Sequence, residues 1–364
     1  MEVTTVVDSK KNLRVALVGC GRIGTRTSDH LRKTTPAGWM PVSHAEAIKC
    51  NKNLELVALC DVDEEKLSWA STTYGIEKCY QDYKSLIVKT EPDILSIATR
   101  TAGRAEIIKF AAEHGVKGIH AEKPLSVNMA DCKKALDAVV KNDVKLTYGT
   151  TRRFMDVYRK AKEIVMAGEI GELVEILVEH GKTTLMWNHP HSVDLLLFFS
   201  NCLEVVYCQA TCIVNPSSVR GKRVDDDPII ENAFVKFGNG VNGIITAASG
   251  LNTRLSCTSG NITIAANGSW IEIRKGIGET SSYHLREEKL EIVPKMSGTQ
   301  RAFCELNAAI RNNKKLSISP EEIAISQNLL FGFVCSSLQK GIRFSLPWLD
   351  DDFTVTGRFG SLYA

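Results

Sequence analysis

Two histidines in the stretch MWNHPHSVDLL, residues 186–196, have a spacing that could do chemistry. His189 and His191 flank a proline just before an apolar run, so they could chelate a metal, transfer a proton or begin a buried helix. The metal interpretation is the least favoured, because His189, His191 and Asp194 could converge only in an irregular loop and no nearby Cys or Glu completes a ligand set. A histidine in the first turn of a helix has a lowered pKa, so its neutral ring could accept a proton near pH 7.

A glycine-rich turn near the N-terminus could bind the phosphates of a dinucleotide. The segment LRVALVGCGRIG places Gly19, Gly21 and Gly24 in GxGxxG spacing between a predicted strand and a predicted helix. This spacing supplies a tight turn, a backbone that a pyrophosphate can approach, and amide groups at a helix N-terminus. We assign Arg22 and Ile23, which complete the turn, to the same site.

An acidic residue at the end of the second long predicted strand bears on the choice of cofactor. A carboxylate at Asp61 could accept hydrogen bonds from both adenosine ribose hydroxyls and would repel a 2′-phosphate, which favours NAD over NADP. The alternative role, a helix N-cap, suits Asp63 better. The separation from Gly24 to Asp61 exceeds the usual spacing of about 20 residues. The extra length falls in KTTPAGWMPVSHAEA, which we interpret as an inserted loop.

A lysine follows another buried strand, in VKGIHAEKPLSVN. Glu122 and Lys123 would lie at the carboxyl edge of a parallel sheet, where ligands of such sheets bind. Oxidising a secondary alcohol requires a group that takes the hydroxyl proton, and a partly desolvated lysine beside a cationic nicotinamide would have its pKa lowered toward that task. The alternative is a surface lysine in a loop.

The elements that must position these residues follow two patterns. Up to about residue 148, short apolar runs alternate with helical segments, which predicts an α/β fold with a doubly wound, parallel Rossmann sheet. The predicted strands there are 13–18, 54–60, 93–98, 116–121 and 144–149. Later strand-like runs are joined by turn signals such as FGNG and AANGS, which predicts an α+β domain with a large, mostly antiparallel open sheet. These runs are 173–180, 204–213, 230–237, 241–248, 261–266 and 269–274, with helices expected at about 155–168, 298–312 and 320–340. We therefore divide the chain into domains 1–149 and 150–364.

Length and composition agree with a two-domain globular protein. The chain has 364 residues, 44% of them apolar and 24% charged, with a formal charge of +3. That charge is small and scattered, so we expect no nucleic-acid partner. No run approaches the roughly 20 apolar residues of a membrane span. The 11 cysteines form no CxxC pair, and several lie in apolar segments, which indicates reduced thiols and a cytoplasmic location.

Five segments, in this order and at these separations, resemble the Gfo/Idh/MocA oxidoreductase family, which includes glucose-fructose oxidoreductase and inositol dehydrogenase. They are VGCGRIG, CDVD, AEKPL, TRRFMDVYRKAKEIVMAGEIGEL and HSVDLLLFF. The resemblance runs over nearly the whole chain. It implies that Lys123 contacts substrate and the nicotinamide ribose, that the peptide to Pro124 can be cis, and that Glu122 holds the turn. It also implies that the second domain binds substrate and mediates homo-oligomer formation, as a dimer or a tetramer, through the open face of its sheet.

The same resemblance bears on the histidines. It aligns His191 with the histidine of the family motif D-x-x-x-H-x-x-D and Asp194 with its final acid, so His191 becomes the expected acid/base partner of Lys123. Trp187 stands where the family has the first aspartate, which puts a simple transfer of the family's substrate contacts in doubt. Asn188 or His189 could supply a polar contact instead, although a satisfied, buried histidine is the favoured interpretation of His189.

Several further residues border the predicted cleft. We assign Ala98 and Thr99, at the end of the strand 93–98, to cofactor binding. Arg104, with Arg100 and Thr101, could bind an anionic part of the substrate or begin a solvated helix. The pair Arg152 and Arg153 could contact substrate or form a structural ion pair. The charged segment 219–228 is predicted to be a solvated loop, with a lid or a subunit contact as alternatives.

These expectations converge on an NAD-dependent dehydrogenase. It would oxidise a secondary hydroxyl of a sugar, nucleotide sugar or cyclitol, with Lys123 and His191 as the acid/base pair and no metal ion. The substrate-binding residues would be Lys123, Arg153, Trp187, Asn188, His191, Asp194 and Arg104. Two alternatives stay open: an oxidoreductase that retains and recycles its cofactor, and a non-catalytic NAD-binding sensor or partner protein.

Overall fold

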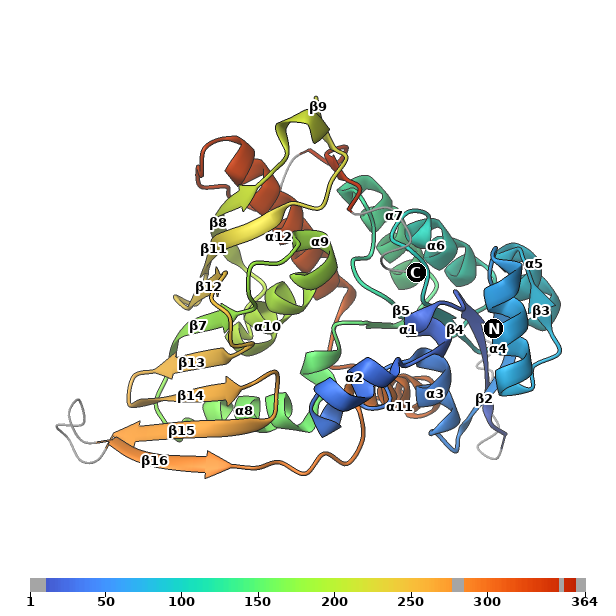
Figure 1. The fold of residues 1–364 in the computed structure, drawn as a ribbon, viewed down its shortest axis with the longest axis horizontal. Coiled ribbons are helices and arrows are strands. Elements are labelled where there is room, and N and C mark those ends of the chain that lie inside the picture. Colours follow the sequence, from blue (N-terminus) through green and yellow to red (C-terminus); the bar gives the residue numbers. More distant parts are fainter. Residues whose placement is uncertain (1–10, 277–284, 347–349, 358–364) are drawn as a thin grey trace, which may run out of the picture.

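The computed structural model describes residues 11–276, 285–346 and 350–357, and contains two large sheets side by side (Figure 1). One sheet carries the N-terminal half of the chain and the other carries most of the C-terminal half. Both predicted fold types are confirmed.

The first sheet has six strands in the order β3-β2-β1-β4-β5-β6, and all of its neighbouring strands pair in parallel. The strands are β1 (Leu13–Val18), β2 (Leu54–Cys60), β3 (Cys79–Tyr80), β4 (Ile94–Ile97), β5 (Gly118–Ala121) and β6 (Lys145–Tyr148). The apolar runs place every residue of β4 and β5 in the core, as expected for strands covered on both faces. The two-residue strand β3 and the helix that follows it were not predicted.

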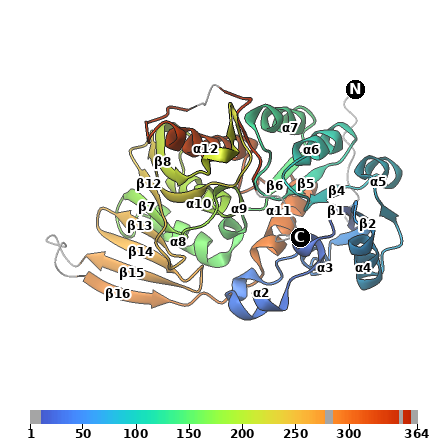
Figure 2. The ribbon, with the colours of Figure 1, turned by 45° about the horizontal axis from the view of Figure 1, so that its top comes forward.

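Helices cover both faces of this sheet (Figure 2). On one side lie α5 (Tyr83–Thr90), α6 (Arg104–Glu113) and α7 (Met129–Lys141). On the other lie α3 (His44–Lys49), α4 (Glu64–Tyr74) and α11 (Gly298–Asn312). Helix α11 comes from the C-terminal part of the chain but packs on β5 and β6 through Phe303 and Leu306. The C-terminal segment therefore helps to build the core of the first domain.

The segment predicted as an inserted loop divides the first helical connection of the Rossmann fold. Helix α1 (Arg22–Thr25) precedes it, α2 (Asp29–Thr34) ends at its start, and the segment itself contains the 3-10 helix η1 (Ala37–Trp39) and the beginning of α3. Trp39 Nε1 donates a hydrogen bond to the carbonyl oxygen of Asn267, 3.0 Å away in the second domain. The insertion is thus a bridge between the domains.

The second sheet has eight strands in the order β16-β15-β14-β13-β7-β12-β11-β8. Its strands are β7 (Leu173–Glu179), β8 (Val205–Ile213), β11 (Ile229–Phe237), β12 (Asn242–Thr246), β13 (Thr253–Cys257), β14 (Gly260–Ala265), β15 (Trp270–Gly276) and β16 (Leu285–Leu290). Only β7 and β12 pair in parallel among these described strands, so the sheet is mostly antiparallel, as predicted.

Three helices pack on one face of the second sheet: α8 (Asp156–Met166), α10 (Pro190–Ser200) and α12 (Pro320–Leu338). A capping box of Ser319 and Glu322 begins α12. Two short helices lie near the candidate site, where the two domains meet. The first, η2 (Thr151–Phe154), follows β6, and the second, α9 (Leu185–Asn188), precedes α10.

A third, small sheet joins the two domains above the candidate site. After the 3-10 helix η3 (Pro216–Ser218), strands β9 (Val219–Arg220) and β10 (Arg223–Val224) form a hairpin, and β17 (Thr354–Val355) pairs with β10 in parallel. This hairpin lies in the charged segment predicted to be a solvated loop. Val224 is fully buried and its carbonyl oxygen accepts a hydrogen bond from Thr356 N, so that prediction was wrong for this strand.

Candidate active site

The glycine-rich turn has the close contacts that a dinucleotide cradle requires. Gly19 has a φ of +101°, and an added Cβ would lie 2.6 Å from the carbonyl carbon of Ala98. An added Cβ at Gly24 would lie 1.9 Å from the carbonyl oxygen of Gly19. At Gly21, by contrast, an added Cβ would meet no atom within 4 Å, so the outer side of the turn is open. Two glycines are therefore required by packing, while the third leaves the backbone open to a ligand, which fits a pyrophosphate.

Asp61 stands beside this turn at the end of β2. Its carboxylate accepts hydrogen bonds from Cys20 N at 2.6 Å and from Asp63 N at 2.9 Å. Asp63 caps α4 by accepting a hydrogen bond from Lys66 N. Asp61 therefore ties the glycine-rich turn to the next loop and remains partly exposed at the edge of the sheet. A carboxylate in this place fits the ribose of a bound dinucleotide.

Lys123 lies where β5 ends and reaches across to the second domain. The peptide between Lys123 and Pro124 is cis, as the family resemblance implied. Lys123 Nζ donates a hydrogen bond to the carbonyl oxygen of Trp187 at 2.7 Å and lies 4.6 Å from the centroid of the Trp187 ring. Burial is the main cause that lowers the pKa of Lys123 below its usual value, and nearby Arg152 adds to the effect.

Glu122 is held at the base of the same turn. Burial alone would raise its pKa, but contacts with His44, Lys123 and Arg104 outweigh burial and lower the pKa to about 2. Its Oε1 lies 3.4 Å from His44 Nε2, and the other nitrogen of that ring lies 2.8 Å from Ser96 Oγ. Glu122 is therefore an ionised, fixed carboxylate behind the lysine.

Arg104 was predicted to contact substrate, but its side chain is buried and bonded to the backbone. Its guanidinium donates hydrogen bonds to the carbonyl oxygens of Pro124 and Thr99, and the residue is 3% exposed. Burial lowers the pKa of Arg104 to about 10. Because the side chain is committed to two backbone carbonyls, it ties the loop after β4, with Ala98 and Thr99, to the turn that carries Lys123.

His191 is the second residue of α10, and Trp187 and Asn188 end the short helix before it. Its Nδ1 is buried and makes no hydrogen bond to any described residue. Burial, followed by the charges of Arg152 and Lys123, lowers the pKa of His191 well below its usual value, so the ring is neutral. A neutral, unsatisfied imidazole next to a lysine of lowered pKa is a group ready to exchange a proton with a ligand.

His189 is packed into the second domain, as expected. It is fully buried, with Nδ1 3.1 Å from Ser192 Oγ and Nε2 3.0 Å from Thr183 Oγ1. Burial lowers its pKa to about 3. Its ring lies 5.3 Å from that of His180, whose pKa burial lowers to about 2. Both rings are neutral parts of the core, and Asn188 likewise bonds within its own turn, to Thr184 Oγ1.

Arg153 and Asp194 form a buried ion pair. Both residues were predicted to contact substrate, and a structural ion pair was the alternative given for Arg153. Their side chains are 0% and 1% exposed, and Arg153 NH2 lies 2.7 Å from Asp194 Oδ1. Arg153 also donates hydrogen bonds to Ser317 O and to Glu322. The two charges neutralise each other inside the protein, where they tie η2 to α10 and α12.

Sequence reasoning missed two residues that build this site. Asn267 Oδ1 accepts two hydrogen bonds from Arg152, from Nε at 3.1 Å and from NH2 at 2.8 Å, and the guanidinium lies 4.9 Å from the centroid of the Trp39 ring. Asp227 accepts hydrogen bonds from two backbone amides of α9. Both residues lie in turns distant in sequence, where nothing local distinguishes them from other polar loop residues.

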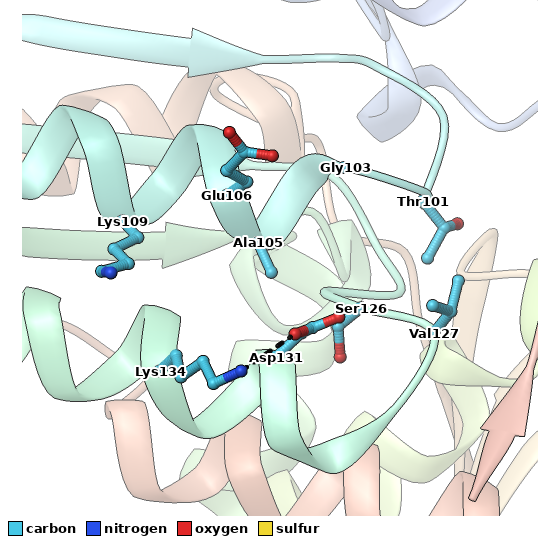
Figure 3. Close-up of a pocket in the computed structure, with 9 residues that line it drawn as sticks. All are labelled: Thr101, Gly103, Ala105, Glu106, Lys109, Ser126, Val127, Asp131 and Lys134. Carbon is cyan, nitrogen blue, oxygen red and sulfur yellow. Dashed lines mark ion pairs between the residues drawn. The ribbon is translucent and has the colours of Figure 1, made fainter. Parts of the chain in front are cut away.

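A pocket of about 400 Å³ lies between α6 and α7 (Figure 3). Figure 3 shows Lys109 on α6 on the side of Asp131 and Lys134 of α7, whereas Glu106 points away from them, and Asp131 and Lys134 are 3.7 Å apart. None of the residues predicted for catalysis lines this pocket.

The described residues contain no group of three or more His, Cys, Asp or Glu side chains that could hold a metal ion. Every cysteine in the chain is free. No helix in the described part of the chain is both long and apolar enough to cross a membrane.

Comparison with known proteins agrees with this geometry. Residues 13–150 match the sequence model of a family described as an oxidoreductase family with an NAD-binding Rossmann fold. Over these residues the chain is similar to the Gfo/Idh/MocA oxidoreductases. The predicted resemblance is thereby confirmed for the first domain, and so is the prediction that this domain binds NAD.

The relatives differ in how much of the chain they match. A myo-inositol 2-dehydrogenase of Thermotoga maritima is 32% identical over 160 residues, which are 44% of this chain and 42% of that protein. An uncharacterized oxidoreductase of Bacillus subtilis, YrbE, is 28% identical over 65% of this chain and 67% of that protein. The match to the inositol dehydrogenase thus spans less than half of that protein's length. The structure of an aldose-aldose oxidoreductase from Caulobacter crescentus, complexed with glycerol, has the same fold. Its TM-score is 0.73 at 19% identity, over 92% of this chain and 100% of that one.

Proposed function

We propose that this protein is an NAD-dependent dehydrogenase that oxidises a secondary hydroxyl of a sugar, nucleotide sugar or cyclitol. The observation that carries the proposal is the meeting of Lys123 and His191. They come from different domains, and Lys123 Nζ bonds the backbone carbonyl of Trp187, four residues before His191. Both have lowered pKa values, and the charge of Lys123 is one cause of the lowered pKa of His191. Similarity to a family member named as a myo-inositol 2-dehydrogenase supports this substrate class.

The cofactor would be held by the first domain. The amides of Gly21, Arg22 and Ile23 would face the pyrophosphate, and Gly19 and Gly24 shape the turn. Asp61 would bind the adenosine ribose, which favours NAD over NADP, while Ala98, Thr99, Glu122 and Lys123 would border the nicotinamide half. When bound, the nicotinamide supplies the acceptor for the hydride.

Proton transfer falls to the residues of the chain itself. Lys123 takes the hydroxyl proton, because burial and Arg152 favour its neutral form, and the neutral His191 ring hydrogen-bonds the same hydroxyl. Trp187 offers an aromatic face to the C–H surface of a sugar, and Asn188 offers an amide. Arg104, Arg153 and Asp194 keep the loops and helices of the site in place and do not contact substrate.

Nicotinamide reduction would be followed against a panel of free sugars, cyclitols and UDP-sugars, with NAD and NADP compared at equal concentration. We expect reduction with at least one polyol and a preference for NAD. Activity with NADP alone would contradict the role of Asp61. No reduction with any member of the panel would favour an NAD-binding sensor instead.

We also propose a cytoplasmic homo-oligomer that assembles through the uncovered face of the second sheet. Strand β8 of that sheet carries two exposed apolar side chains, Val206 at 46% and Ile213 at 42% exposure, and pairs with β11. A shallow pocket on the same strands is lined by Tyr207, Gln209, Thr211, Asn232, Phe234 and Arg343. Light scattering of the purified protein tests this proposal, and a monomeric mass would contradict it.

A further inference from the structure

Helix α9 is capped by a residue that is far away in the sequence. Its own N-cap residue, Thr184, makes no side-chain capping hydrogen bond. Instead, Asp227 Oδ1 accepts a hydrogen bond from Met186 N at 2.7 Å, and Asp227 Oδ2 accepts one from Trp187 N at 3.2 Å. Asp227 is 2% exposed, so these charge-assisted hydrogen bonds form out of water, where losing a partner costs most.

The residue next to Asp227 completes this cap. Pro228 O accepts a hydrogen bond from Leu185 N at 2.7 Å. Asp227 and Pro228 together therefore satisfy the first three amide groups of α9, which a helix cannot satisfy internally. These contacts from a distant segment fix the start of α9, beside the burial of its own Leu185 and Met186.

The same short helix holds Lys123. Trp187 N donates to Asp227, and Trp187 O accepts the hydrogen bond from Lys123 Nζ at 2.7 Å. One residue of the second domain thus connects a buried carboxylate on one side to the lysine of the first domain on the other. A shift of α9 would move both the carbonyl acceptor and the aromatic ring that lie against the lysine.

We infer that Asp227 is a positioning residue for Lys123: it fixes the helix that accepts the lysine's hydrogen bond and sets the charge around its amino group. The effect on turnover rests on the proposed function, whereas the effect on the lysine itself does not.

The groups that face Lys123 come from several elements. The charged and titratable side chains that act on it, or on which it acts, are Glu122, Asp227, Arg104, Arg152, His180 and His191. Among them only the two carboxylates raise the pKa of Lys123, against burial and two guanidinium groups. Glu122 adjoins the lysine in sequence and contacts His44. Asp227 is therefore the carboxylate through which the second domain acts on the lysine.

The hairpin that delivers Asp227 is itself anchored to the turn of Lys123. Strand β10 ends three residues before Asp227 and pairs with β17. Val355 in β17 donates its backbone hydrogen bond to Val127 O at 2.9 Å, four residues after the lysine. Two routes thus connect the Asp227 carboxylate to Lys123, one through Trp187 and the other through β10, β17 and Val127, so the fold fixes their separation.

The proton affinity of Lys123 can be measured without any substrate. Its rate of acylation by acetic anhydride, read by mass spectrometry of the peptide as a function of pH, gives the pKa of the amino group. Asp227→Asn retains one oxygen acceptor for α9 but removes the charge. We expect the pKa of Lys123 to fall measurably in this variant, because a carboxylate that raises it is neutralised, and the acid limb of kcat/KM to move to lower pH with it.

Asp225→Asn is the matched control. It removes the same charge two residues away, where Asp225 pairs with Arg223 at the surface, and it should leave the pKa of Lys123 within about 0.2 of wild type. A folded Asp227→Asn protein with an unchanged Lys123 pKa would overturn the inference. If that variant does not fold, Asp227→Glu decides, because it keeps the charge and should keep a Lys123 pKa close to that of wild type. A clear fall in the Glu variant would also overturn the inference.

The two readouts separate this inference from the proposed function. A shift in the labelling profile, with no oxidation of any polyol by wild type, supports the positioning role and removes only the dehydrogenase. Polyol oxidation by wild type, with no labelling shift in folded Asp227→Asn, supports the dehydrogenase and overturns only the positioning role of Asp227.

Discussion

Lys123 and Trp187 meet across the domain interface through a 2.7 Å hydrogen bond from the lysine Nζ to the tryptophan backbone carbonyl. The contact does not depend on the identity of the tryptophan side chain, although Lys123 Nζ also lies 4.6 Å from the centroid of its ring. The lysine is therefore held by the path of the backbone, which leaves the side chain at position 187 free to vary with substrate.

Cofactor choice should depend on Asp61. In Asp61→Ala the ribose loses its carboxylate partner, and we expect NAD to bind about 10-fold more weakly, with a smaller preference over NADP. Titration with both dinucleotides measures the ratio of the NADP and NAD dissociation constants. Asp63→Ala, which removes the α4 cap, should cost about 1 kcal/mol of stability without altering the ratio. An unchanged ratio in Asp61→Ala would contradict the assignment.

Two glycines of the turn should respond differently to the same substitution. Gly24→Ala places a Cβ 1.9 Å from Gly19 O, so the turn must distort, and we expect a loss of about 2 kcal/mol of stability together with NAD binding. Gly21→Ala meets no neighbouring atom, so its stability should stay close to that of wild type while NAD binding weakens. Thermal melts with and without NAD distinguish the two, and equal stabilities would count against the packing argument.

The buried pair Arg153 and Asp194 should be a stability device. Removing one partner, as in Asp194→Ala, leaves an uncompensated buried charge and should cost about 3–5 kcal/mol in urea unfolding. Replacing both residues with apolar side chains should cost less than the sum of the single variants. Substrate KM in the folded fraction should change little. A stable Asp194→Ala protein with a greatly raised KM would restore the substrate-contact interpretation.

Stability should fall on mild acidification. Burial lowers the pKa values of His120, His180 and His189 to about 3, 2 and 3. The unfolded chain binds protons at these residues below about pH 6.5 while the folded protein does not, so their contribution is fully present above that pH and is lost as the pH falls toward 3. At pH 5.5 the three residues together predict a loss of about 4 kcal/mol.

Urea unfolding at several pH values between 8 and 5.5 measures this loss. The dependence of the unfolding free energy on pH should weaken by about one quarter in His180→Gln, because the buried, neutral His191 acts in the same direction as the other three histidines. A stability that stays constant over this range would show that these rings do not remain neutral in the folded protein.

The sequence was sufficient to predict the bounds of an element where its local pattern is compatible with only one kind of structure. Strands β1 and β2 and helix α11 have the predicted bounds, because long apolar periodicity and clear caps leave few alternatives. The site could be assembled only in part. Lys123 and His191 carry motifs, whereas Asp227 and Asn267 act through contacts across 40 and 115 residues, which no local pattern encodes. Arg104 was predicted to bind an anionic part of the substrate, and Arg153 to contact substrate or form a structural ion pair, because charge is visible in a sequence, whereas burial and hydrogen-bond partners are not.

Turnover of Lys123→Ala, measured beside the NAD affinity of the same protein, tests whether Lys123 takes the hydroxyl proton. Nicotinamide absorbance would be followed with the best polyol of the screen, and NAD binding by calorimetry. The account predicts that turnover falls by about 10²–10⁴-fold, that NAD affinity changes by less than about threefold, and that added methylamine partly restores the rate. Wild-type turnover in a folded Lys123→Ala protein would contradict the assignment of Lys123 as the group that takes the hydroxyl proton.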